Sequence, residues 1–275
     1  MNKNLLIYCL TLNPDHLSLI KKIGYSPVGL GSEKFSDDFL TDNKGDNISN
    51  KNKYYGEYTF HYFLWKNHLP KIKTDWIGFC QYRKFWTNQL IKDYKNLSFE
   101  NFNNNILKDI PKNKNNYETI IGEPFFVDNY KYTKLFKKAL KKIILNPSIL
   151  FRKRERNLKF HFDLFHGEGN IEKAILLVDP IDREDFSKFI YENISFNPHN
   201  MFICRSVKTL KSYYESVFPW LERCEKEFGF NLEGYGMQRI YGFLAERYMS
   251  FWFKKYTNFT TLPIQFKDIT DFNND

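Results

Sequence analysis

The sequence predicts an α/β domain whose first half carries an open sheet and whose C-terminal part is helical. Strand-length apolar runs alternate with amphipathic stretches in the first half, which is the pattern of a mainly parallel sheet. Two long helical patterns follow, at about 207–228 and 235–255. Hydrophobic residues make up 42% and aromatic residues 19% of the chain, which suffices for a sizeable core. We interpret residues 1–275 as a single domain.

The N-terminal third contains the clearest element signals. Leu5 to Leu12 reads as a strand closed by the turn signal Asn13-Pro14-Asp15. The glycines of PVGLG (27–31) allow close backbone approach, so Gly29 is a candidate substrate contact. A helix is predicted from Tyr54 to Leu69 and ends before Pro70.

A second group of elements completes the prediction. Trp76 to Gln81 reads as a buried strand, and Tyr117 to Gly122 as another. The remaining segments are a surface insertion (88–116), a basic amphipathic helix (130–145), a mobile basic-aromatic flap (151–166) and a strand with a turn (194–204).

The net charge of +9 indicates anionic partners: phosphate groups, anionic lipid or nucleic acid. The basic residues are dispersed and form no known nucleic-acid-binding motif, so a nucleic-acid-binding protein is the weaker alternative. Four scattered cysteines fit a reducing compartment. The N-terminus lacks a secretory pattern, and no apolar run approaches the roughly 20 residues of a membrane span. We expect a cytoplasmic protein that touches the inner membrane face through its charge.

The stretch GDNISNKNKYYGEYTFHYFLWKN (45–67) places polar residues around a predicted helix start. Asp46 and Asn47 precede the helix, and Asn52 and Glu57 lie in or near its first turns. Free N–H groups at a helix N-terminus can hold a ligand oxygen. The competing interpretation is that these residues are ordinary caps and turn formers. Glu57 and His61 have the i,i+4 spacing of a helix-surface pair.

The strand Trp76 to Gln81 runs directly into Tyr82-Arg83-Lys84. Ligands of open α/β sheets bind beyond the carboxyl ends of the strands, where many sugar-nucleotide transferases carry an Asp-x-Asp metal motif. This chain has no Asp-x-Asp. Its two cations are able to neutralise a diphosphate directly, with the arginine bidentate, unless they form a plain solvated turn.

Four further candidates lie in the second half. Arg239 and Glu246 share one helical stripe in YGMQRIYGFLAERY (235–248), where they would frame a pocket or form a buried ion pair. Asn200 stands in a turn before an apolar strand, and His166 precedes Gly167. A lone histidine is more often structural than catalytic.

Several ordered motifs resemble a family of bacterial glycosyltransferases of capsule, exopolysaccharide and O-antigen biosynthesis, long described only as a domain of unknown function. This family includes the galactofuranosyltransferase domain of a bifunctional O-antigen polymerase. The resemblance extends from Leu5 to about Phe266. Its markers are PVGLG (27–31), GDNISNKNKYYGEYT (45–59), Trp65-Lys66-Asn67, IGFCQYRKF (77–85), His166, NMFICR (200–205) and YGMQRIYGFLAER (235–247).

The resemblance implies a fold like the single Rossmann-type (GT-A) transferases, a UDP-sugar donor with galactofuranose as first choice, and a growing lipid-linked glycan as acceptor. Another hexose, with either stereochemical outcome, and a non-catalytic glycan-binding module are the alternatives. Arg83, Lys84 and Arg239 suit the diphosphate, and Asp46, Glu57, His166 and Glu246 are the candidate bases. Further substrate contacts are expected from Gly29, Asn47, Asn52, Tyr55, Tyr82 and Asn200.

One departure from the family bears on the chemistry. The family usually shows His-Tyr-Arg-Arg where this chain has Gln81-Tyr82-Arg83-Lys84, so acid/base chemistry at the first position is doubtful and Arg83 is the better diphosphate ligand. We expect no metal cofactor. The alternative is Mn or Mg held by carboxylates such as Asp179 and Asp182.

Overall fold

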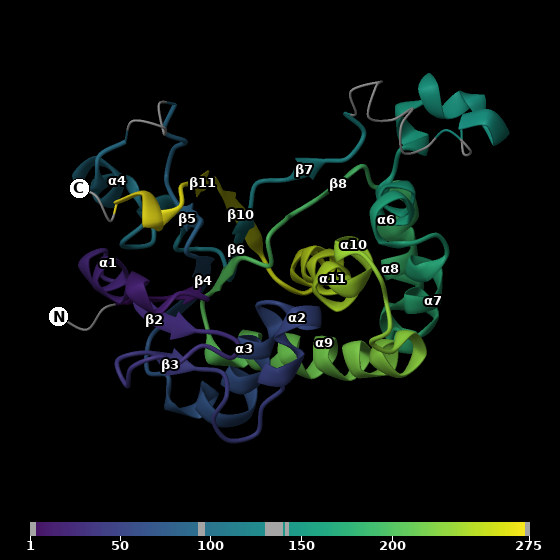
Figure 1. Cartoon of the computed structure of the whole chain (residues 1–275). Helices are drawn as coiled ribbons and strands as arrows, with labels where there is room; N and C mark the ends of the chain where they lie inside the picture. The colour runs from purple at the N-terminus through teal and green to yellow at the C-terminus, as the bar shows by residue number, and fades with distance from the viewer. Residues whose placement is uncertain (1–3, 93–96, 130–139, 141–142, 273–275) are drawn as a thin grey trace. The chain divides into compact units, whose positions relative to one another are not determined.

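The computed structural model describes residues 4–92, 97–129, 140 and 143–272 (Figure 1). Contacts between Cα atoms divide the chain into two compact units. Unit 1 comprises Met1–Glu123, His199–Glu215 and Phe253–Asp275, and unit 2 comprises Pro124–Pro198 and Ser216–Trp252. That the whole chain acts as a single domain stays a prediction.

Unit 1 is built on a nine-stranded mixed sheet among the described residues, in the order β10-β6-β9-β4-β1-β2-β3, with β5 joining β4 to β11. Its strands are β1 (Leu5–Thr11), β2 (Ser26–Gly29), β3 (Leu40–Thr41), β4 (Trp76–Gln81), β5 (Lys84–Trp86), β6 (Thr119–Gly122), β9 (Phe202–Cys204), β10 (Phe259–Leu262) and β11 (Ile264–Phe266). The strands β1 to β4 are parallel, and β9 runs antiparallel to both of its neighbours. The predicted open α/β sheet is therefore confirmed.

Helices cover both faces of this sheet because successive strand residues point to opposite sides. On one face, Leu5, Ile7 and Cys9 of β1 join a core with residues of α1 (Leu17–Lys22) and α4 (Phe99–Asn105). On the other face, Tyr8 of β1 contacts the ring of Phe60 in α3 (Tyr58–Phe63). The first two turns of α9 (Val207–Phe228) belong to unit 1 and pack on this second face.

Unit 2 is mainly helical. Its elements are β7 (Phe125–Phe126), α6 (Leu158–His166), α7 (Asn170–Leu176), α8 (Pro180–Glu192), β8 (Ser195–Phe196), the rest of α9, α10 (Tyr235–Gln238) and most of α11 (Ile240–Tyr256). The helices α6, α7 and α8 pack against one another (Figure 1), and β7 pairs with β8. Among the described residues no helix is long and apolar enough to span a bilayer.

Three element predictions need correction. The predicted helix 54–69 is divided into α2 (Asn52–Tyr55), α3 and a π-helical turn at Leu64–His68, because Gly56 has φ +58° and interrupts the first helix. The insertion 88–116 is not purely a surface segment, since Phe102 of α4 is fully buried. Residues 158–166 of the expected flap form α6, which buries Leu158 and Phe162. The predicted helix 130–145 lies mostly outside the described residues.

A buried polar cluster joins α3 to the start of α9. Nδ1 of His61 lies 2.7 Å from the hydroxyl oxygen of Tyr214, and the hydroxyl groups of Tyr58 and Tyr213 are hydrogen bonded. His61 is thus buried against α9 and does not lie on an exposed helix surface. Burial lowers the pKa of His61 from 6.5 to about 3, so this histidine is neutral in the folded protein.

We expect this histidine to make the fold sensitive to acid. The unfolded chain binds a proton at His61 below pH 6.5 whereas the folded chain does not, so the free energy of unfolding falls as the pH drops. The loss amounts to about 2 kcal/mol between pH 7 and pH 5. Urea denaturation at both pH values should show a shallower pH dependence for His61→Gln, whose amide still bonds Tyr214. Equal pH dependence in the two proteins would contradict the prediction.

Candidate active site

The candidate site lies at one edge of the unit 1 sheet. Because β1 to β4 are parallel, their last residues (Thr11, Gly29, Thr41 and Gln81) meet at the same edge. The antiparallel β9 begins at this edge, so the residues before it reach the site as well. Positive φ angles at His199 (80°) and Asn200 (53°) turn the chain into β9 there. This edge is where open α/β sheets bind ligands.

Glu57 lies against the end of β4. Its Oε1 accepts a hydrogen bond of 2.8 Å from Nε2 of Gln81, and the same nitrogen donates to the carbonyl oxygen of His199 at 3.0 Å. The interruption at Gly56 places Glu57 directly before α3, where its side chain is half-buried. Glu57 is therefore the predicted carboxylate that the structure brings to the carboxyl edge.

A second polar group at this edge centres on Asp42, which the sequence analysis did not single out. Asp42 is fully buried and accepts a hydrogen bond of 2.5 Å from Oγ1 of Thr59, which in turn accepts from Nδ2 of Asn52 at 3.0 Å. Burial raises the pKa of Asp42, while the hydrogen bond from Thr59 and backbone N–H groups act in the opposite direction. The sequence pattern that could have indicated Asp42 is its position directly after β3 (Leu40–Thr41), at the end of a short strand.

The loop before α2 is held by its own side chains. Oδ1 of Asn47 accepts from the backbone N–H of Ser49 at 3.2 Å and from its hydroxyl at 2.9 Å, as in an Asx turn. Asp46 is exposed, and its carboxylate lies 3.3 Å from the hydroxyl of Tyr62. These contacts agree with the interpretation that the polar residues of this loop are ordinary turn formers. A catalytic role for Asp46 stays a prediction.

Two predicted substrate contacts have clear packing roles. A Cβ atom on Gly29 would lie 2.4 Å from the ring of Phe35, so this position must be glycine for the ring to pack there. The side chain of Tyr55 is buried at 3% exposure. Substrate contact by either residue stays a prediction.

The turn Tyr82-Arg83-Lys84 is fixed by the C-terminal part of the chain. Backbone N–H groups of Lys267 and Ile269 donate to the carbonyl oxygens of Arg83 and Tyr82, at 3.1 Å each. Nε of Arg83 donates to Oδ2 of Asp268 at 2.7 Å, and the guanidinium carbon lies 4.7 Å from the ring centre of Tyr82. No local pattern indicates Asp268 as a partner of Arg83, because the two residues are 185 positions apart in the chain.

The arginine at this turn is more exposed than the aspartate that it binds. Although burial alone would raise the pKa of Asp268, hydrogen bonds from Thr270 and Arg83 lower it. The Arg83 side chain remains 61% exposed, and its bond to Asp268 uses Nε. Burial and the charge of Lys84 lower the pKa of His199 to about 3, so this ring is neutral.

The three site candidates of unit 2 have structural partners within that unit. Nδ1 of His166 lies 3.0 Å from the carbonyl oxygen of Gly236, and the ring packs 4.1 Å from that of Phe243. Glu246 pairs with the buried Arg247 at 2.6 Å, and the guanidinium of Arg239 lies over the ring of Tyr235. Roles in catalysis for these residues stay predictions.

The alternative metal ligands also have protein partners. Asp182 is buried and accepts from the hydroxyl of Tyr248 at 3.3 Å, and Asp179 pairs with Arg223 at 3.4 Å. Within the described ranges no three His, Cys, Asp or Glu side chains are grouped as metal ligands. Whether the protein uses a metal stays a prediction.

The comparison with protein families gives one match, to the domain of unknown function DUF4422, over residues 10–258. The chain belongs to this family. The match takes in parts of both units, including the β4 tip and α11, and ends before β10 and β11. The family's description assigns no activity, and a comparison with curated proteins gave no match.

One solved structure identifies the fold. The apo structure of the WbbM bifunctional glycosyltransferase matches with a TM-score of 0.66 and 19% identity, over 95% of this chain and 45% of that one. This member of DUF4422 therefore has a glycosyltransferase-like Rossmann fold and spans less than half of the WbbM chain. The mannosyltransferase Ktr4p from S. cerevisiae gives a TM-score of only 0.32 at 13% identity, over 90% of this chain and 63% of that one.

Proposed function

We propose that this protein is a glycosyltransferase that moves a sugar from a UDP-sugar to a growing cell-surface glycan. The observation that carries the proposal is that Glu57, which is hydrogen bonded to Gln81, and Arg83, which is bonded to Asp268, both lie near the end of β4, on the carboxyl edge of a glycosyltransferase-like sheet. A carboxylate and a guanidinium are the two groups that such a transfer needs. Galactofuranose is the first choice of donor sugar, by the resemblance of the motifs at 27–31, 45–59 and 77–85 to galactofuranosyltransferases.

In the proposed reaction the acceptor hydroxyl attacks the anomeric carbon of the donor and loses its proton to Glu57. The bond between that carbon and the diphosphate oxygen breaks, and UDP leaves with the bonding electrons. The terminal nitrogens of Arg83 bind the diphosphate and stabilise its growing charge, and Lys84 adds a second cation. The backbone bonds from Lys267 and Ile269 hold this turn in place before the substrate arrives.

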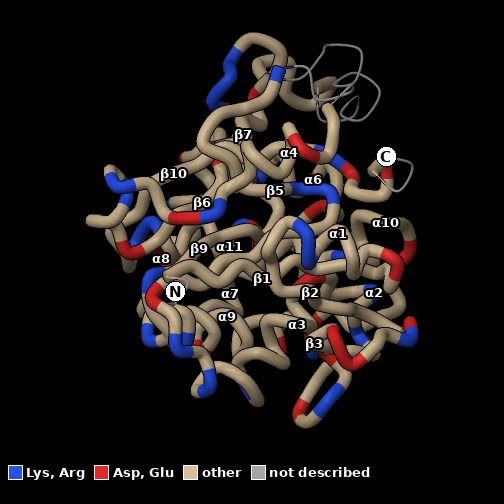
Figure 2. The backbone as a smooth tube through the Cα atoms, turned by 90° about the vertical axis from the view of Figure 1, so that its left-hand side faces the viewer, with Lys and Arg blue, Asp and Glu red and all other residues tan. Residues whose placement is uncertain are grey.

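The acceptor in this proposal is a lipid-linked glycan at the inner membrane face, with the protein in the cytoplasm and in peripheral contact with anionic lipid. A nucleic-acid-binding role has less support. In Figure 2, Lys and Arg positions alternate with Asp and Glu positions along the described part of the backbone. A non-catalytic glycan-binding module is the remaining alternative.

A panel of UDP-sugars tests the proposal. UDP and the correct donor should raise the melting temperature, because a ligand that binds the native state stabilises it. Mass spectrometry should then detect UDP release from that donor. Thermal stabilisation without any UDP release would favour the non-catalytic module, and no response to any nucleotide sugar would remove the proposal.

We also expect turnover without a divalent metal. A metal contributes several kcal/mol of charge stabilisation to a leaving phosphate, and fixed cations in a site of low water content can replace much of it. The assay is repeated with metal-stripped protein in excess EDTA. Complete loss of turnover that manganese or magnesium restores would contradict this expectation.

A further inference from the structure

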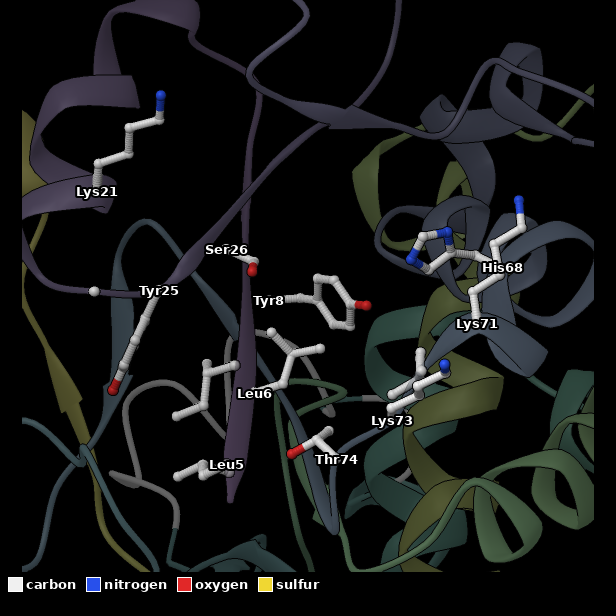
Figure 3. Close-up of a pocket in the computed structure, with 13 residues that line it drawn as sticks. Leu5, Leu6, Tyr8, Lys21, Tyr25, Ser26, His68, Lys71, Lys73 and Thr74 are labelled. Carbon is white, nitrogen blue, oxygen red and sulfur yellow. The ribbon is translucent and has the colours of Figure 1, made fainter. Parts of the chain in front are cut away.

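A cavity of 470 Å³ lies in unit 1 at the amino ends of the strands, away from the carboxyl edge of the candidate site (Figure 3). Its walls include Leu5 to Tyr8 from the first half of β1 and Ser26 from the start of β2. The segment from His68 to Thr74, which leads into β4, closes another side. In Figure 3, Tyr8, His68 and Lys73 lie on one side of β1, whereas Lys21 and Tyr25 lie on the other.

The cavity gathers positive charge. Three of its thirteen lining residues are lysines (Lys21, Lys71 and Lys73), and none of the thirteen is an aspartate or glutamate. Lys21 reaches Asp38 outside the lining at 2.8 Å, but this pair is about half exposed and is weak in water. Burial and the charge of Lys71 lower the pKa of His68, so the positive charges of the lining act on one another. An anion bound in the cavity would relieve this repulsion.

Neutral hydrogen-bond donors complete the lining. Burial raises the pKa of the Tyr8 phenol, which therefore keeps its proton and can donate to an anion at neutral pH. Ser26 adds a hydroxyl group, and its backbone is in register with Tyr8 across β1 and β2. Hydroxyl donors together with ammonium groups match the several acceptor oxygens of a phosphate.

We propose that this cavity binds a phosphate group, carried either by a soluble phosphoester or by an anionic lipid headgroup. The ligand is held by Lys71, Lys73 and His68, with Tyr8 donating from the floor of the cavity. Because the cavity lies at the amino ends of the strands, its occupant and a substrate at the carboxyl edge can bind at the same time.

The first measurement follows the ring protons of His68 by NMR while inorganic phosphate replaces chloride at constant ionic strength, with His68→Gln to assign the signal. We expect a saturable shift. The double variant Lys71→Gln/Lys73→Gln should weaken phosphate binding at least about tenfold, the scale of a lost charged hydrogen bond. A matched control, Lys112→Gln/Lys208→Gln, removes the same charge from exposed positions of unit 1 outside the cavity and should leave the affinity unchanged.

Sedimentation with phosphatidylglycerol or phosphatidylcholine vesicles distinguishes the two sources of phosphate. Binding to phosphatidylglycerol that only the Lys71/Lys73 variant loses identifies a lipid headgroup, whereas the phosphate shift without this vesicle binding identifies a soluble phosphoester. Circular dichroism checks that both double variants fold. The proposal would be overturned if the cavity variant and its control lost phosphate or vesicle binding equally. It would also be overturned if the wild type showed neither a saturable shift nor vesicle binding that depends on the two lysines. None of these readouts depends on transferase activity.

Discussion

Replacing Glu57 with glutamine is expected to lower turnover by about 10²-fold, the lower end of what a positioned general base contributes. The amide can still accept the hydrogen bond that Gln81 donates at 2.8 Å, so the local structure should persist while the ability to take a proton is lost. Turnover of the best donor under saturating conditions is the measurement. The melting temperature of the variant should be close to that of the wild type, which excludes unfolding as the cause of the lower turnover.

Two further variants make this test specific. Glu100→Gln removes an exposed carboxylate of α4 and should leave turnover unchanged. Asp46→Ala tests the other carboxylate of the 45–59 motif, whose neighbours form turn contacts. Full activity in both Glu57→Gln and Asp46→Ala would show that this motif only shapes the start of α2 and α3.

The second large effect is expected on nucleotide binding. Arg83→Ala should weaken the binding of UDP by about 1.5–3 kcal/mol, or roughly 10- to 150-fold in Kd, because a charged hydrogen bond to the diphosphate is lost. Isothermal titration calorimetry measures the affinity directly. The affinity of Arg83→Lys for UDP should lie between those of the wild type and Arg83→Ala, since lysine keeps the positive charge but loses the two-pronged hydrogen bonding of the guanidinium.

The control for this variant is Arg205→Ala. Arg205 directly follows β9, at the opposite end of that strand from His199, and its guanidinium donates to the carbonyl oxygen of Asn115 at 2.7 Å. Its removal changes the net charge equally and should leave the affinity for UDP unchanged. An unchanged affinity in Arg83→Ala would remove this arginine from the site.

The sequence predicted those elements whose signals are local. The strand Trp76–Gln81 and the helix Val207–Phe228 have the predicted bounds, because an apolar run and a long amphipathic repeat define them without help from distant residues. The break at Gly56 was missed because the apolar pattern continues across it. Phe102 was assigned to the surface because a single aromatic residue among asparagines gives no periodicity.

The candidate site was predictable in part for the same reason. Glu57 and Arg83 stood out by residue type and by position next to a strand or helix end. Asp42 and Asp268 did not, because their importance comes from partners that only the folded chain supplies: Thr59 for Asp42 and Arg83 for Asp268. The same holds for His166, whose partner Gly236 is 70 residues away, and for Glu246, which pairs with its direct neighbour Arg247. No helical spacing rule indicates either contact.

The closure of the β4 turn by residues 264–269 also bears on how the protein is made. Arg83 leaves the ribosome early, but β11 and then Asp268, which is 185 residues after Arg83, follow much later, so the turn stays open throughout most of synthesis. Contacts between such distant segments form late in folding because the long intervening loop must close first. We therefore expect a chain released before residue 264 to build much of its sheet and to lack an ordered Arg83. Removal of residues 264–269 should therefore weaken the proposed nucleotide binding in the same way as Arg83→Ala does.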